Sequence, residues 1–104
     1  MASEMRIDIQ ADGVVVVGGD VEESELSRLR ETLHEVITHH AEAWVDLSAT
    51  GFLPSAAIGV VARATGRAVE QGNLLTIVAA DGSRAARTLG MAMVPFEPEI
   101  SRRG

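Results

Sequence analysis

Residues 44–59 read Trp-Val-Asp-Leu-Ser-Ala-Thr-Gly-Phe-Leu-Pro-Ser-Ala-Ala-Ile-Gly. The pattern predicts a buried strand over residues 43–47, a short loop, and a helix that begins at Ser55. A strand that delivers its end to a helix N-terminus builds a place for a phosphoryl group or a partner protein. This stretch therefore indicates an α/β fold with a candidate site at the strand-to-helix junction.

A hairpin and a helix are predicted before this stretch. Residues 5–10 alternate in polarity and residues 14–17 are all Val, so two strands should meet around a turn at Gly13. Ser24 is the predicted N-cap of the helix. That helix should close near His39 and carries an apolar stripe at helical spacing: Leu26, Leu29, Leu33, Val36 and Ile37.

The pattern continues after the junction. A helix over residues 55–71 should end at Gly72, and residues 74–80 form a third buried strand. Asp81 or Ser83 can cap a short helix through Leu89, which Gly90 stops. Residues 91–96 then add a short strand or packed segment, and residues 97–104 read as a frayed tail. The predicted core stripe of the second helix is Ile58, Val61, Ala62, Thr65 and Val69.

The predicted fold is therefore a single α/β domain over residues 1–104. Strands that alternate with helices imply a mostly parallel sheet, here of four to five strands, with an antiparallel N-terminal edge hairpin and helices packed on it. The chain has 104 residues and 46% hydrophobic residues, enough for a core of its own.

Composition narrows the function classes. The net charge is −6 and the chain has no Lys, which argues against direct nucleic-acid binding and fits a protein partner. Cys is absent, so disulfide and thiolate chemistry are excluded. No apolar segment approaches the roughly 20 residues of a membrane helix, and no signal peptide is visible. A cytoplasmic protein without membrane insertion is expected.

No motif predicts catalysis. His34 and His39 stand five residues apart, whereas two metal ligands on one helix face need a spacing of four. Gly18-Gly19 lacks the Lys of a phosphate-binding loop, and Asp46 has no base or metal partner beside it in sequence. The sequence therefore predicts no enzyme, no metal and no cofactor.

Two blocks resemble the STAS domain family, the family of the anti-anti-sigma factors. Residues 19–33 are similar, without gaps, to a family pattern Gly-Glu-Leu-Asp followed by a helix reading Leu-Arg-x-x-Leu, with the family's Asp at Glu22. Residues 44–59 are similar to a strand ending Asp-Leu-Ser that leads to Phe-x-Asp-Ser-Ser-Gly. The strand order and the run over residues 72–78 agree as well, so the resemblance covers nearly the whole chain.

The resemblance implies a non-catalytic anti-sigma factor antagonist that binds an anti-sigma factor or kinase-type regulator. In the family, phosphorylation of the second serine ends that binding. Here this position is Ala56, with Pro54 at the Asp and Ala57 at the Gly, so the usual acceptor is absent. Ser55 is expected to cap the helix, with a phospho-acceptor role as the alternative. The predicted partner-binding residues are Asp20, Glu22, Ser24, Pro54, Ser55, Ala56, Ala57, Gly59, Val60 and Arg63.

Two points stay open at the level of sequence. The alternative function is a STAS-like accessory subunit of a transport system or a small-molecule sensor, which some family members are. The oligomeric state is not fixed, and a homodimer is allowed.

Overall fold

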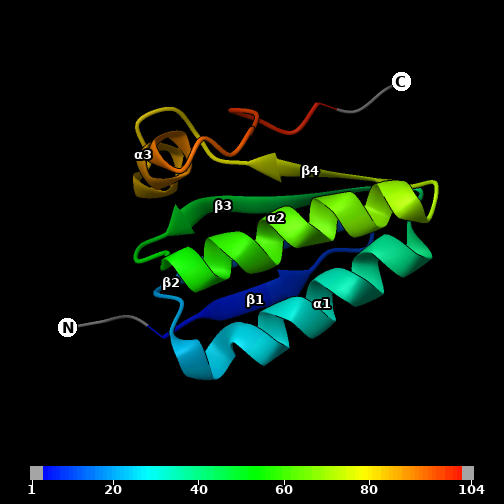
Figure 1. Cartoon of the computed structure of the whole chain (residues 1–104), viewed down its shortest axis with the longest axis horizontal. Coiled ribbons are helices and arrows are strands. Elements are labelled where there is room, and N and C mark those ends of the chain that lie inside the picture. Colours follow the sequence, from blue (N-terminus) through cyan, green and yellow to red (C-terminus); the bar gives the residue numbers. More distant parts are fainter. Residues whose placement is uncertain (1–3, 102–104) are drawn as a thin grey trace.

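The computed structural model describes residues 4–101 (Figure 1). Within this range an N-terminal hairpin is followed by alternating helices and strands, as predicted. The elements are β1 (Arg6–Ile9), β2 (Val14–Gly19), η1 (Glu23–Glu25), α1 (Leu26–His39), β3 (Glu42–Thr50), α2 (Ser55–Glu70), β4 (Leu74–Val78) and α3 (Arg84–Met91), where η1 is a 3-10 turn.

The sheet confirms the predicted fold class. Its order is β1-β2-β3-β4, antiparallel between β1 and β2 and parallel elsewhere. β3 extends beyond the predicted end at Leu47 to Thr50. The register with β2 shifts between Val16 and Gly18, so that the last residues of both strands still pair, Gly19 with Thr50. The Thr50 hydroxyl donates to the Val17 carbonyl oxygen at 2.9 Å inside the protein, which fixes this end of the sheet.

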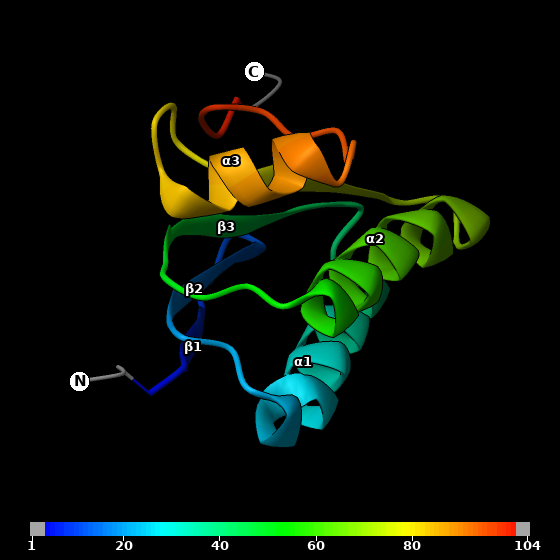
Figure 2. The same cartoon turned by 60° about the vertical axis from the view of Figure 1, so that its left-hand side comes forward.

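Helices α1 and α2 lie side by side along the sheet (Figures 1 and 2). Leu29, Leu33, Val36 and Ile37 of α1 are buried in the main core, as predicted. The predicted stripe of α2 is only partly correct: Val61 is buried and Ile58 packs, partly buried, against the main core. The buried side chains of α2 are Ala57, Val60, Val61, Ala64 and Ala68, whereas Val69 is 64% exposed. Three of these five are Ala, so α2 approaches its neighbours closely.

Of two predicted helix caps, Ser24 is wrong and Ser83 is confirmed. Ser24 lies inside η1, where the Glu25 N–H donates to the Glu22 carbonyl at 2.9 Å, so α1 begins at Leu26 and Ser24 does not cap it. Ser83 is confirmed as the N-cap of α3, because its Oγ accepts from the Ala86 N–H at 3.1 Å.

The segment after α3 is anchored to the protein. α3 ends one residue past Gly90, and Met93 adopts a left-handed backbone with φ 59°. No further strand forms among the described residues; Glu97 makes a single parallel bridge with Val78 instead. Ile100 packs against a small cluster around Trp44, on the sheet face away from the main core. The predicted frayed tail is therefore wrong for residues 97–100, and residues 102–104 lie outside the described residues.

Candidate docking site

The Asp-Leu-Ser motif has a structural role in β3. The Asp46 Oδ1 accepts the N–H of Ser48 at 2.9 Å. The Ser48 Oγ in turn accepts the Ala80 N–H at 2.8 Å, just beyond the end of β4. These bonds tie the ends of two neighbouring strands together and fix the point at which the chain leaves β3. They give both polar side chains of the motif a structural role.

Two loops are joined at the next step of the chain. The Gly51 N–H donates to the Gly19 carbonyl at 2.8 Å, and the Val21 N–H donates to the Phe52 carbonyl at 2.9 Å. The carboxylate of Asp20 accepts the Phe52 N–H at 2.7 Å. The β2–α1 loop and the β3–α2 loop are therefore held as one unit at one end of the sheet, although they lie about thirty residues apart in sequence.

The start of α2 corrects the expected role of Ser55. The N-cap residue is Pro54, whose carbonyl accepts the N–H groups of Ala57 at 2.9 Å and Ile58 at 3.0 Å. Ser55 is the first helical residue, its side chain makes no cap hydrogen bond, and it is exposed. Ala56 is exposed beside it. Position 56 thus carries a methyl group at the surface.

The remaining predicted residues divide between core and surface. Ala57 and Val60 are buried at 0% and 4% exposure, so their side chains do not reach a partner. Gly59 lies under the Arg63 guanidinium, whose Nη1 would stand 3.4 Å from a Cβ added at Gly59. Together with Phe52, the surface residues form what we call the candidate docking face: Asp20, Glu22, Ser24, Phe52, Pro54, Ser55, Ala56, Gly59 and Arg63.

Phe52 is the residue that sequence analysis did not single out. Its side chain is 53% exposed. It forms a wall of two hollows. One, of about 330 Å³, is also lined by Asp20, Val21, Glu22, Glu23 and Pro54. The other, of about 380 Å³, is also lined by Gly51, Leu53, Arg84, Arg87, Thr88 and Met91. An aromatic residue in a loop, in a chain with only two Phe, was the available signal.

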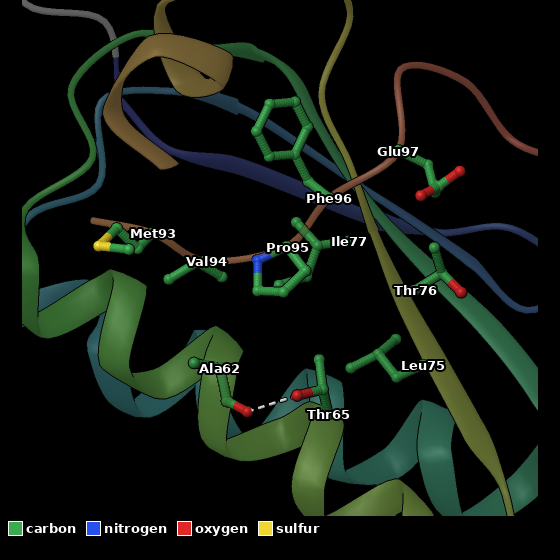
Figure 3. A pocket seen from close by; sticks show the side chains of 10 residues that line it. All are labelled: Ala62, Thr65, Leu75, Thr76, Ile77, Met93, Val94, Pro95, Phe96 and Glu97. Atoms are coloured by element: carbon green, nitrogen blue, oxygen red, sulfur yellow. Dashed lines mark hydrogen bonds between the residues drawn. The ribbon is translucent and has the colours of Figure 1, made fainter. Parts of the chain in front are cut away.

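A third hollow lies elsewhere, between α2, β4 and the segment after α3 (Figure 3). Its volume is about 320 Å³, and its walls include Leu75, Ile77, Val94, Pro95 and Phe96. The Thr65 hydroxyl at its floor donates to the Ala62 carbonyl at 2.6 Å. This hollow shares no residue with the docking face.

Two further features are absent from the described part of the chain: a metal-binding cluster and a membrane-spanning helix. Among residues 4–101, no cluster of three or more His, Asp or Glu side chains could hold a metal ion. The His39 ring nitrogen Nδ1 lies 2.9 Å from the Glu35 carbonyl on the same helix. In the same range no helix has the length and apolar character needed to cross a bilayer.

Comparisons with known proteins support the fold. No model of a known protein family matches the chain. Among solved structures, the anti-sigma factor antagonist SpoIIAA in its unphosphorylated form is similar with a TM-score of 0.65 and 12% identity, covering 94% of this chain and 90% of that one. An anti-sigma factor antagonist from Mycobacterium paratuberculosis is similar with a TM-score of 0.65 and 20% identity, covering 93% of this chain and 86% of that one. The phosphorylated form of SpoIIAA from Bacillus is similar with a TM-score of 0.63 and 12% identity, covering 86% of this chain and 83% of that one. The chain has the fold of these antagonists, the STAS fold.

Proposed function

We propose that this protein is a non-catalytic regulatory domain that binds an anti-sigma factor, or a related kinase-type regulator, through the docking face. One observation carries the proposal: hydrogen bonds join the β2–α1 and β3–α2 loops into one ordered surface beside the exposed start of α2. The fold shared with anti-sigma factor antagonists supports the same role. The protein would act in the bacterial cytoplasm as a regulator of transcription, without contacting DNA itself.

The loops are ordered before any partner arrives. Three hydrogen bonds, two between backbones and one to Asp20, hold Phe52 and its neighbours in place. A surface that is already ordered loses less conformational entropy on binding, so more of the contact energy contributes to affinity. Phe52 is the natural anchor, because exposed aromatic side chains near the centre of an interface often carry much of the binding energy.

Control by phosphorylation would differ from that of the usual motif. A phosphate brings about −1.5 to −2 charges and repels a closely packed or acidic partner surface. Ala56 has no hydroxyl, so this position cannot be modified. Ser55 is the one hydroxyl in residues 54–57, and its side chain does not cap the helix. A kinase that phosphorylates the residue before position 56 would modify Ser55. Without such a kinase, the protein stays competent for binding at all times.

The test uses purified anti-sigma kinases from the source organism, titrated one at a time by calorimetry with ADP and with ATP. Phe52→Ala should raise the dissociation constant about thirtyfold, the loss typical of an interface anchor. Val69→Ala is the matched control, because Val69 is exposed on α2 but lies outside the docking face. Absence of wild-type binding to every kinase, with either nucleotide, would refute the proposal.

Intact-mass analysis tests the regulation separately. After incubation with a binding kinase and ATP, the wild type should gain no phosphate, whereas Ala56→Ser should gain one. A phosphate on the wild type that disappears in Ser55→Ala would instead assign the switch to Ser55.

A second candidate function is favoured by the third hollow. A small-molecule sensor, or a STAS-like accessory subunit of a transport system that responds to a ligand, would use the apolar space between Leu75, Val94 and Phe96. Ligand pockets in proteins start at about 300 Å³, so the space suffices for a small apolar compound. A thermal shift with a nucleotide or lipid panel, abolished by Thr65→Trp, would support this function over the first.

A further inference from the structure

Charges of opposite sign lie on the two sides of Phe52. The hollow on one side carries Asp20, Glu22 and Glu23, and the hollow on the other side carries Arg84 and Arg87. Both Glu side chains and both Arg side chains are exposed. Neither guanidinium has a carboxylate oxygen within 4.0 Å in the described part of the chain, where the one ion pair is Arg28 with Glu25. These four charges are therefore available to a partner.

The three segments that carry these groups are arranged in order. In both views the β3–α2 loop with Phe52 lies between the β2–α1 segment on one side and α3 on the other (Figures 1 and 2). The two hollows are similar in size, at about 330 and 380 Å³. Acidic groups, an exposed aromatic ring and basic groups thus follow one another across this end of the molecule.

We propose that a second copy of this chain occupies this surface and forms a two-fold dimer centred on Phe52. A two-fold operation brings the same patch of both subunits face to face, so residue i of one meets residue j of the other and the reverse. With the axis through Phe52, Glu22 and Glu23 of each copy face Arg84 and Arg87 of its partner. The two Phe52 rings then meet at the axis, and aromatic pairs are favourable there.

The dimer should be weak and sensitive to salt. Exposed ion pairs contribute little each, but the symmetry doubles every contact and Phe52 and Met91 add apolar area, with Met91 81% exposed in the monomer. Added salt screens exposed charges beyond about 8 Å at physiological ionic strength. Self-association should therefore rise with protein concentration and fall with salt, although the net charge of −6 opposes it.

Dimerisation would also regulate access to the docking face. If the proposed function holds, the dimer covers Phe52, which the regulator needs, so the two associations exclude each other. A chain with Ala56 at the acceptor position would then be controlled by its own concentration instead of by phosphate at that residue. This consequence rests on the proposed function, whereas the dimer itself does not.

Sedimentation velocity of the purified chain, without any partner, tests the dimer. Wild type should show a sedimentation coefficient that rises with concentration at low salt. Glu22→Arg/Glu23→Arg makes both sides of Phe52 basic, and Arg84→Glu/Arg87→Glu makes both sides acidic. Each variant alone should lose self-association by at least about tenfold in dissociation constant, since like charges then face each other. An equimolar mixture should form a heterodimer.

Controls separate this result from effects on folding and on net charge. Glu31→Arg/Glu35→Arg and Arg30→Glu/Arg67→Glu reverse the same number of charges at exposed helix positions outside the patch, and both should dimerise as wild type does. The heterodimer itself shows that both charge variants are folded. A wild type that stays monomeric at the highest concentration in low salt, or a mixture that stays monomeric, would overturn the proposal. Failure of kinase binding would leave the dimer result unaffected.

Discussion

Gly51 lies close to the carboxylate of Asp20. We therefore predict that Gly51→Ala lowers the stability of the wild type but raises the stability of the Asp20→Ala variant. A Cβ added at Gly51 would collide with the Asp20 Oδ1. The next nearest atoms, the Asp20 Cγ at 3.6 Å and the Arg84 Nη1 at 3.8 Å, leave ordinary contact distances. The backbone of Gly51 is outside the left-handed region, so alanine is otherwise tolerated there. The obstacle to Gly51→Ala is therefore a single carboxylate oxygen.

The size of the effect on stability follows from the hydrogen bond that the Asp20 oxygen would lose. To make room, Asp20 must leave the Phe52 N–H, which it accepts at 2.7 Å in an exposed setting. Loss of such a charge-assisted hydrogen bond costs about 1.5 kcal/mol, the lower end of its range. Gly→Ala gains about 0.5 kcal/mol by restricting the unfolded chain. Gly51→Ala should thus destabilise wild type by about 1 kcal/mol and stabilise Asp20→Ala by about 0.5 kcal/mol.

Urea unfolding of wild type, both single variants and the double variant measures this cycle. Trp44 is the only Trp and is 5% exposed, so its fluorescence reports global unfolding. Gly66→Ala is the control, since a Cβ there meets nothing within 4 Å and should stabilise both backgrounds by about 0.5 to 1 kcal/mol. An equal cost of Gly51→Ala in both backgrounds would refute the reasoning, because the two residues would then act independently.

Three further stability predictions use the same assay. Met93→Gly should stabilise by about 1 kcal/mol, because Met93 has φ 59° at the C-terminal end of α3 and glycine adopts this backbone freely; a loss of stability would contradict it. Thr50→Val should cost about 1 to 2 kcal/mol, because the buried Val17 carbonyl loses its donor, and an unchanged stability would show that another donor replaces it. Ser83→Ala should lower the free energy of unfolding by about 1 kcal/mol, because Ser83 caps α3, and Ser55→Ala should lower it by less than about 0.5 kcal/mol. A larger loss for Ser55→Ala than for Ser83→Ala would show that Ser55 caps α2 after all.

Local patterns in the sequence predicted the architecture well. The alternation over residues 5–10 and the Val run after Gly13 correspond to the hairpin, and the stripe of α1 matches its buried face. Gly72 ends α2 with φ +77°, as a glycine after a helix indicates. These features depend on residues that are close together in the sequence, so the sequence pattern alone predicts them.

Features that depend on distant residues escaped prediction. The extension of β3 requires the register shift in β2, and the joined loops require the Asp20 carboxylate opposite Phe52. The buried face of α2 was misassigned because Ala and Val occur on several of its faces, so periodicity alone does not select one. The Ser55 hydroxyl stands at the right place in sequence for a cap, but Pro54, extended with ψ 160°, is the N-cap residue and Ser55 is the first residue of the helix.

The bridge at Glu97 covers part of the edge of the sheet formed by β4 and so hinders the pairing of a further strand there. Glu97 donates its N–H to the Ile77 carbonyl and accepts the Ala79 N–H, both at 2.9 Å, so it occupies backbone groups on the outer side of β4. Pro95 and Pro98 stand on either side of it, and proline has no N–H to continue a ladder. At the opposite edge, the four-residue strand β1 carries the charged side chains of Arg6 and Asp8. Neither edge therefore favours pairing with an added strand, which protects the folded protein against cross-β aggregation. Recognition is left to the loops and helix ends.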